Sequence, residues 1–145
     1  MKESYIQDFE AWQKEFTFSI DIEVRFSETD LFGHLNNTVP FVYFEQARIA
    51  LMKEYELVGA NLSPDSPIVP VVADLQCDFL KQIFFGETIQ MFAKFAKLGS
   101  SSVDIHYMGV VNGEVRLTGR GTLVQMNAHT GRAEKWSMPQ IQRIH

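Results

Sequence analysis

The feature that most constrains this chain is a long apolar stretch with helical spacing, flanked by segments with the alternating pattern of strands. Large or apolar side chains recur every three or four residues from Phe41 to Tyr55, and few charges fall on any face of this stretch. A helix near residues 39–58 with so little polar surface has to be buried along most of its length. We therefore expect a fold in which other elements surround one central helix.

Residues that start and stop helices stand at both ends of this stretch. Asn36 or Asn37 can cap the start. Pro40 fits in the first turn, where its missing N–H leaves no intrahelical bond unmade. Gly59 can close the end.

The rest of the chain predicts one short helix and five strands. Residues 4–15 have the spacing of a short amphipathic helix, which we expect to lie on the main body. Residues 19–26 alternate apolar and charged side chains and predict the first strand. After a turn region at Ser63–Pro67 the chain reads as strands to its end. These four later strands are expected near residues 71–79, 89–95, 103–111 and 114–126.

Two details of the strand region indicate its geometry. Asn112-Gly113 predicts a type I′ hairpin turn, because both residues tolerate the positive φ that this turn needs. Gly119 and Gly121, two positions apart on one face, mark a place where another group packs close or where the sheet bends. In the strand at residues 71–79 the alternation places Val71 and Cys77 on the same face.

These patterns predict an α+β fold, a five-stranded antiparallel sheet wrapped around one long central helix, with a short N-terminal helix. Strands joined by short turns pair as antiparallel neighbours, and an apolar helix needs an apolar sheet face to cover it. We expect a single domain over residues 1–145, with residues 1–17 as an N-terminal helical extension. The outer sheet face and the open strand edge are left to be covered, so a homodimer or a dimer of dimers is expected.

Composition excludes several classes of protein. The net charge is −5, from 14 acidic and 5 basic residues in 1–78 and 4 acidic and 8 basic residues in 79–145. The basic half is a solvated face or contacts an anionic partner, but it is too weakly basic for a nucleic-acid binder. No apolar run is long enough to cross a membrane. The first residues lack the pattern of a secretory signal and Cys77 is the single cysteine, so we expect a cytoplasmic protein.

Polar residues are densest in the loop of residues 27–39, between the first strand and the long helix. Taken alone, Asp30 is a residue type that is common in turns, and the asparagines that follow it can cap the start of the long helix. His34 has no second histidine at metal-ligand spacing, so no metal is expected. Cys77 lies among apolar residues and is expected to be inert. No phosphate-binding loop or serine elbow is present, which leaves Asp30 as the candidate for chemistry.

Two runs of residues carry a resemblance to a known family. The run 24–37, Val-Arg-Phe-Ser-Glu-Thr-Asp-Leu-Phe-Gly-His-Leu-Asn-Asn, is followed by 43–48, Tyr-Phe-Glu-Gln-Ala-Arg. Together they resemble the signature of the hotdog-fold acyl-CoA thioesterases of the 4-hydroxybenzoyl-CoA thioesterase family. The resemblance extends over about residues 18–140 and includes the turns near 86–89 and 98–102. It implies a hotdog fold for the sheet and helix.

The resemblance also implies roles for residues of the loop and helix. Asp30 matches the catalytic carboxylate, which acts as a nucleophile or as a general base on water. The N–H groups near Asn37 and Thr38, at the helix start, match the contact to the thioester oxygen. His34 would orient Asp30 or the carbonyl, with Asn37 as a second polar contact. Glu45 pairs with Arg48 one helical turn away, or faces the site.

Substrate contacts are implied in two places. Gly33 and Thr38 lie in the loop, and Lys97, Leu98, Gly99 and Ser100 lie in the turn between two strands. In this turn only Lys97 is basic, where relatives often carry several basic residues. Contacts to the coenzyme A phosphates would therefore come from a scattered set of residues: Lys81, Lys94, Lys97, Arg120 and Arg132.

Pro40 also departs from the family, which usually has an aromatic residue at this position. The function implied is the hydrolysis of a small or medium acyl- or aroyl-CoA thioester to free acid and coenzyme A. No cofactor is expected beyond the coenzyme A of the substrate. The alternatives are a protein on the same fold that binds acyl-CoA or an acyl carrier without turnover, and an assembly protein in which the loop only caps the helix.

Overall fold

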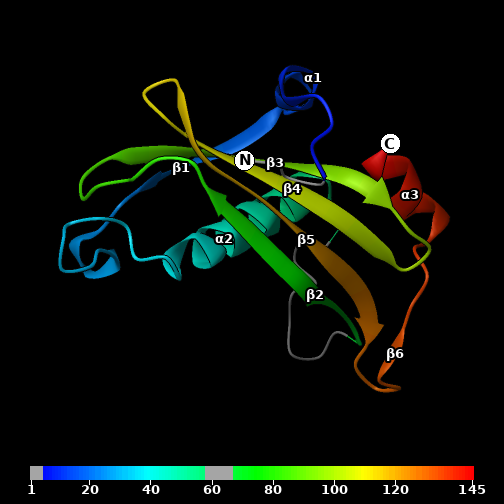
Figure 1. Ribbon diagram of the computed structural model, residues 1–145. Helices are drawn as coiled ribbons and strands as arrows, with labels where there is room; N and C mark the ends of the chain where they lie inside the picture. Colours follow the sequence, from blue (N-terminus) through cyan, green and yellow to red (C-terminus); the bar gives the residue numbers. More distant parts are fainter. Residues whose placement is uncertain (1–4, 58–66) are drawn as a thin grey trace.

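The computed structural model describes residues 5–57 and 67–145, in which an antiparallel sheet curls around one long helix (Figure 1). The elements, in chain order, are α1 (Phe9–Lys14), β1 (Phe18–Glu23), the 3-10 helix η1 (Phe26–Glu28), α2 (Val39–Glu54), β2 (Ile68–Phe79), β3 (Thr88–Leu98), β4 (Ser102–Val111), β5 (Glu114–Asn127), β6 (Arg132–Ala133) and α3 (Met138–Ile144). The predicted α+β class and the hotdog arrangement of sheet and helix are confirmed.

The sheet has the strand order β1-β3-β4-β5-β2, and every pair is antiparallel. The Asn112-Gly113 turn joins β4 to β5 with φ values of 50° and 77°, as the hairpin signal predicts. A sixth strand, β6, pairs with the end of β5, and helix α3 follows it. The prediction of strands to the end of the chain is therefore wrong for the last residues.

The sequence around helix α3 contains two features that are typical of a helix start. Ser137 and Gln140 form a capping box, in which each side chain accepts a hydrogen bond from the other residue's backbone N–H. Pro139 in the first turn is also typical of a helix start. The helix is only seven residues long, so it presents too few turns for its apolar spacing to stand out.

The central helix begins and ends differently from the prediction in detail. Pro40 lies in the first turn as predicted, but the N-cap position is Thr38. Helix α2 ends at Glu54, because Glu56 takes a left-handed conformation with φ 57°. The N–H of Leu57 then bonds to the carbonyl of Met52, which satisfies the helix end without a glycine. The predicted stop at Gly59 lies outside the described residues.

The core lies between α2 and one face of the sheet, which we call the inner face (Figure 1). Phe44 of α2 is fully buried and stacks on Tyr107 of β4 with 4.3 Å between ring centroids. Gly119 makes room for this stack, because a Cβ at that position would lie 2.4 Å from the Phe44 ring. A Cβ at Gly121 would lie 2.6 Å from the side chain of Leu75. The prediction of close packing at these two glycines is confirmed.

Two strand predictions are wrong in detail. A β-bulge between Val72 and Asp74 shifts the register of β2, so that Val72 packs on the core and Val71 is 43% exposed. The strand β1 ends at Glu23, and Phe26 begins the 3-10 turn with its side chain 76% exposed. In both places a local change of backbone direction breaks the period of two that the sequence displays.

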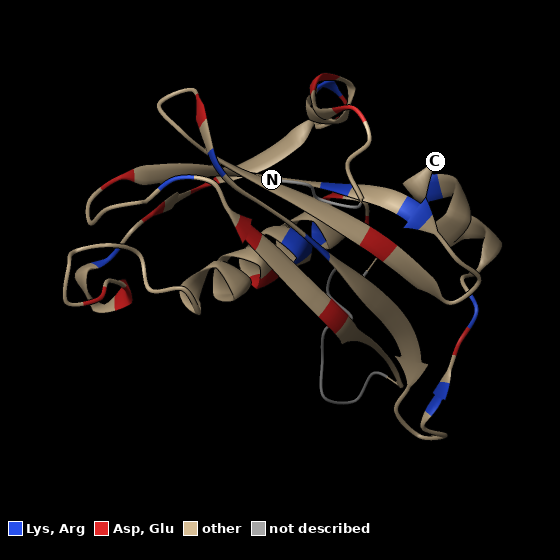
Figure 2. Cartoon of the chain, viewed as in Figure 1, with Lys and Arg blue, Asp and Glu red and all other residues tan. Residues whose placement is uncertain are grey.

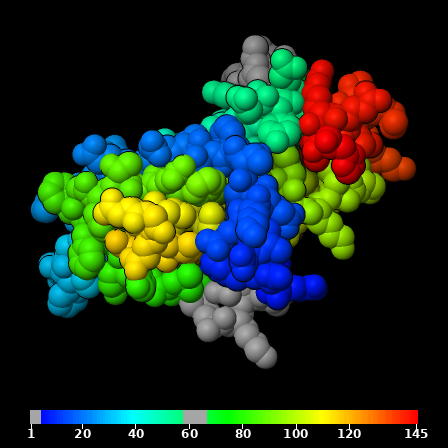
Figure 3. All heavy atoms as spheres, turned by 90° about the horizontal axis from the view of Figure 1, so that it is seen from above, coloured from blue at the N-terminus to red at the C-terminus, as the bar shows by residue number. Residues whose placement is uncertain are grey.

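The opposite face of the sheet, which we call the outer face, is partly covered by the chain's own N-terminal segment. Helix α1, capped by Asp8, packs on the sheet beside the β4–β5 hairpin (Figure 3). Trp12 and Phe16 are buried there against Met108. The expectation that this face would need a second chain to cover it is therefore wrong for the part under α1. No helix in the described residues is long and apolar enough to span a membrane.

Candidate active site

The loop between η1 and α2 closes into a tight turn around Asp30. Its Oδ1 accepts hydrogen bonds from the backbone N–H groups of Phe32 at 2.9 Å and His34 at 3.1 Å. The Asp30 N–H donates to the carbonyl of His34 at 2.8 Å. Gly33 takes φ 77°, which a glycine adopts without steric cost. Asp30 Oδ2 receives no hydrogen bond from the described part of the chain, so one carboxylate oxygen is held in place but chemically available.

The start of α2 carries a second polar feature close to this turn. Asn36 Oδ1 accepts hydrogen bonds from both the backbone N–H and the hydroxyl of Thr38, each at 3.0 Å. The Asn36 carbonyl accepts the N–H of Val39 at 3.0 Å. The N–H of Asn37 donates to no acceptor within the described residues, and Pro40 has none to donate. The donor left for a substrate oxygen is therefore the Asn37 N–H, whereas that of Thr38 is occupied.

One cavity of about 580 Å³ joins these two features. The residues that line it are Asp30, His34, Leu35, Asn36, Asn37, Phe79, Leu80, Lys81, Gln82 and Ile83. The structure thus brings together three of the predicted catalytic residues, Asp30, His34 and Asn37, from one loop. The other wall comes from the end of β2 and the segment between β2 and β3, from which the sequence analysis named only Lys81 as a possible substrate contact.

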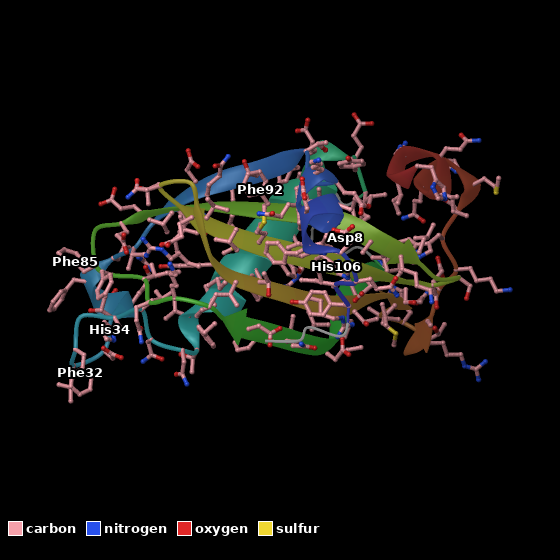
Figure 4. The ribbon with its side chains drawn as sticks, turned by 45° about the horizontal axis from the view of Figure 1, so that its top comes forward. Asp8, Phe32, His34, Phe85, Phe92 and His106 are labelled. Atoms are coloured by element: carbon pink, nitrogen blue, oxygen red, sulfur yellow. The ribbon has the colours of Figure 1, made fainter. Side chains whose placement is uncertain are left out.

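His34 contributes through its backbone rather than its ring. The strand-like bridge between His34 and Phe84 fixes the loop on the β2–β3 connection, and the two rings meet edge to face at 5.0 Å. Its ring nitrogens make no hydrogen bond within the described residues, so the group that holds Asp30 is the His34 N–H. Phe32, His34 and Phe85 lie together at one end of the molecule (Figure 4). Phe32 and Phe85 are 80% and 58% exposed there.

Glu45 lies outside this cavity. Its carboxylate is 3.6 Å from the Arg48 guanidinium, and its side chain is 64% exposed. This is the ion pair that the spacing of one helical turn predicts, formed between the exposed Glu45 and the buried Arg48. The sequence left two interpretations of Glu45, a pair with Arg48 or a position facing the site. The structure of the single chain agrees with the pair.

The turn at Lys97–Ser100 lies at the opposite end of the sheet from Asp30 (Figure 1). Strand β3 begins beside the Asp30 loop and runs 11 residues to this turn, roughly 35 Å. Leu98 packs against the core. The carbonyl of Ser100 accepts the backbone N–H of Trp136 at 2.9 Å, so the C-terminal segment occupies this turn. Within one chain, the predicted substrate contacts at Lys97, Leu98, Gly99 and Ser100 are not brought to Asp30.

Two of the five basic residues proposed for phosphate contacts, Arg120 and Lys94, are engaged elsewhere. Charges are spread along the strands rather than gathered on one surface (Figure 2). Arg120 pairs with Asp74 and Asp104, which raise its pKa. Lys94 is 10% exposed under α1, and burial lowers its pKa. Lys81 is the member of the proposed set that lines the cavity, where it pairs with Glu114.

A buried carboxylate lies beneath the loop, two residues before Asp30. Glu28 is 9% exposed and accepts hydrogen bonds from the Tyr43 hydroxyl at 2.7 Å and the Arg25 backbone N–H at 2.9 Å. Burial alone would raise the pKa of Glu28, but the hydrogen bonds from Arg25 and Tyr43 outweigh it and lower the pKa. Sequence reasoning read Glu28 as one polar loop residue among several. Its spacing of three from Arg25 was the one available signal.

Comparison with known proteins found a matching family model and a similar protein sequence. Residues 24–143 match the family model of the thioesterase-like superfamily. An uncharacterized protein of Bacillus subtilis (strain 168), YsmA, is 39% identical over 130 residues, which cover 89% of this chain and 86% of that protein.

Two solved structures are also similar. One is a predicted thioesterase from Bacillus stearothermophilus, with 29% identity, a TM-score of 0.79, and coverage of 88% of this chain and 92% of that one. The other is a thioesterase from Thermus thermophilus complexed with coenzyme A and Zn, with 29% identity, a TM-score of 0.75, and coverage of 89% and 92%.

Proposed function

Because the chain belongs to the thioesterase-like superfamily, we propose that it hydrolyses a small or medium acyl- or aroyl-CoA thioester to the free acid and coenzyme A. One observation carries the proposal. A single cavity holds an immobilised carboxylate with one free oxygen, Asp30, and an unengaged N–H at a helix start, Asn37. A thioester carbonyl needs these two groups, an activated oxygen to attack it and a donor for the charge that develops on its oxygen.

The chemistry follows from this arrangement. As a general base, Asp30 takes a proton from water while the water oxygen bonds to the thioester carbon. The carbonyl oxygen then gains negative charge, which the Asn37 N–H and the positive end of α2 stabilise. When the tetrahedral intermediate collapses, the C–S bond breaks and the thiolate leaves. A free thiol has a pKa near 8.5, so the thiolate needs no strong acid to leave at neutral pH.

As a nucleophile, Asp30 would instead bond to the thioester carbon and release the thiolate, giving an anhydride that water then hydrolyses. A single turnover in ¹⁸O-labelled water identifies the nucleophilic route when water attacks the aspartyl carbon, because attack on the substrate carbon labels the product acid in both routes. The general-base route places the label in the product acid. Attack of water on the aspartyl carbon of the anhydride leaves the first product unlabelled and labels Asp30, which mass spectrometry of the protein detects.

Replacement of Asp30 tests the proposal. We expect Asp30→Asn to lower thiol release from a panel of acyl- and aroyl-CoA thioesters by about 10²- to 10⁴-fold, the usual contribution of a positioned base. The matched control is Asp21→Asn, which removes an exposed carboxylate from β1 and should retain full activity. A wild-type chain inactive on every thioester, or a fully active Asp30→Asn variant, would contradict the proposal. If the wild type gains thermal stability with acyl-CoA but shows no turnover, the chain is a binding protein instead.

We also propose that the chain forms a homodimer or a dimer of dimers. The support is the edge strand β2, where Val71, Leu75 and Phe79 are 43%, 37% and 47% exposed. An open strand edge with apolar side chains favours pairing with a second chain. Light scattering should give a mass of two or four chains. Asp substitution at Leu75 should lower that mass, whereas a monomeric wild type would refute the proposal.

A further inference from the structure

Glu28 is bonded to three separate segments of the chain, two through its buried carboxylate and one through its backbone carbonyl. Its side chain accepts the Tyr43 hydroxyl at 2.7 Å, the Arg25 N–H at 2.9 Å and the Arg25 guanidinium at 3.1 Å. Its backbone carbonyl accepts the N–H of Asn36 at 2.8 Å. Glu28 therefore ties together Arg25, which follows β1, the side of α2, and Asn36 in the loop before α2.

The bond between Glu28 and Tyr43 is the buried part of this arrangement. Tyr43 is 1% exposed and projects from the second turn of α2. Burial and the neighbouring carboxylate raise the pKa of Tyr43, so its proton stays on the phenol and is donated to Glu28. A hydrogen bond to an ionised carboxylate out of water is strong, and losing the Tyr43 hydroxyl removes the bond between Glu28 and α2.

We propose that Glu28 and Tyr43 are positioning residues that set Asp30 against the start of α2. Asp30 is two residues after Glu28 in the chain, and Asn37 directly follows the Asn36 that Glu28 holds. Tyr43 fixes the body of α2 to the same carboxylate. Among the described residues, neither Glu28 nor Tyr43 lines the cavity, so the pair acts on a substrate through Asp30 and Asn37.

This inference rests on the proposed function, in which the spacing between Asp30 and the Asn37 N–H decides the rate. A displacement of about 1 Å in a catalytic group can cost about 10²-fold in rate. Loss of the pair frees both features to move relative to each other while each keeps its local hydrogen bonds. The expected signature is a lower kcat with an unchanged KM, because the cavity walls that bind the substrate stay in place.

The test removes the hydroxyl of Tyr43 and compares the effect with removal of the hydroxyl of Tyr107, a second buried tyrosine of the core. Tyr43→Phe should lower kcat by 10- to 100-fold and leave KM within twofold of wild type. Hydrogen exchange of the backbone over residues 26–38 should become faster. The control, Tyr107→Phe, removes the hydroxyl of another tyrosine that is 1% exposed but belongs to β4. It should retain the kcat and the exchange rate of the wild type.

Glu28→Gln is the second variant, because it keeps the volume and an oxygen that can accept the bond from Tyr43. We expect a smaller fall in kcat than for Tyr43→Phe, about threefold to tenfold, and a smaller gain in exchange. If Tyr43→Phe does not fold, Glu28→Gln decides the question. Wild-type kcat and exchange in the folded variants would overturn the inference, and so would an equal loss of kcat in Tyr107→Phe.

Failure of this inference can be told apart from failure of the proposed function. An active wild type with an inactive Asp30→Asn variant establishes the function, and the tyrosine variants then decide the role of the pair. A wild type without turnover refutes the function and the catalytic part of the inference together. Even then, exchange over residues 26–38 shows whether the pair holds the loop to α2.

Discussion

The inner face of the sheet is covered by α2 and part of the outer face by α1, and different interactions stabilise these two contacts. On β4, Ile105 and Tyr107 point to the inner face and are at most 1% exposed among apolar side chains of α2. On the same strand, His106 points to the outer face and is 6% exposed beneath Trp12 of α1. Alternation along a strand therefore shows which residues share a face, but it does not show whether a polar face meets water.

The outer face is organised by directional hydrogen bonds. The Trp12 indole N–H donates to His106 Nδ1 at 2.8 Å, and an indole can only donate, so Nδ1 carries no proton. His106 Nε2 therefore carries the proton and donates to Asp104 at 3.0 Å. Arg120 joins Asp104 to Asp74 on the neighbouring strands. Figure 4 shows His106 under the N-terminal segment, far from the loop of His34. We expect this face to respond to charge and pH, and the inner face to respond to volume.

The largest effect is expected on the inner face. Phe44→Ala removes a fully buried ring from the stack with Tyr107 and should lower the free energy of unfolding by about 3–5 kcal/mol. Urea unfolding at pH 7.5 and pH 5.5 measures this loss. Because no ionisable group is removed, the loss should be the same at both pH values. If the loss of unfolding free energy differed by more than about 1 kcal/mol between the two pH values, the prediction that the inner face does not respond to pH would be contradicted.

The next largest effect is expected from Arg120→Leu on the outer face. Arg120 is 18% exposed and bonds to Asp104, which is 22% exposed, so its loss leaves a partly buried carboxylate unpaired. We expect a loss of about 2 kcal/mol, less than for a fully buried pair because water reaches both groups. In the Asp104→Asn background the same substitution should cost less, which a double-mutant cycle in urea measures. Additive losses would show that the two side chains do not act together.

These differences explain why the fold was easier to predict than its details. The apolar helix and the alternation at residues 103–111 each display one period, and both elements are present. The bulge after Val72 has no glycine to mark it, and it reverses the face of every residue on one side of it. The packing of α1 on the outer face depends on a hydrogen bond from Trp12 to His106. These residues are 94 positions apart in the sequence, so no local pattern indicates the contact.

The same reasoning applies to the candidate site. The proximity of Asp30, His34 and Asn37 was predictable because one short loop carries all three. Lys81 and Gln82 line the same cavity but come from another connection, so only the strand order brings them there. The burial of Glu28 depends on Tyr43, 15 residues later, and a polar residue in a polar loop gives no sign of it.

The third prediction concerns pH and sharpens the contrast between the faces. Burial lowers the pKa of His106 below its ordinary value of 6.5, and the attraction of Asp104 only partly opposes this. The folded chain then binds fewer protons at this site than the unfolded chain, so stability falls as the pH drops below about 6.5. His106→Asn keeps an acceptor near the position of Nδ1 but cannot titrate. Urea midpoints between pH 7.5 and 5 should fall more in the wild type than in this variant, and parallel curves would refute the role of His106.

The smallest effect is expected from Trp12→Phe, which removes the N–H that fixes the His106 tautomer but keeps an aromatic ring beside Phe16. The loss should be about 1 kcal/mol at pH 7.5, the usual worth of one hydrogen bond. It should shrink at pH 5, because Nδ1 can now take a proton without facing another donor. Trp136→Phe is the control, since it removes a 2.9 Å bond from an indole to the carbonyl of Ser102, which does not titrate. We expect Trp136→Phe to lose the same stability at both pH values, whereas the loss of stability in Trp12→Phe becomes smaller at pH 5. This pair of results would assign the pH response to the contact between α1 and the sheet.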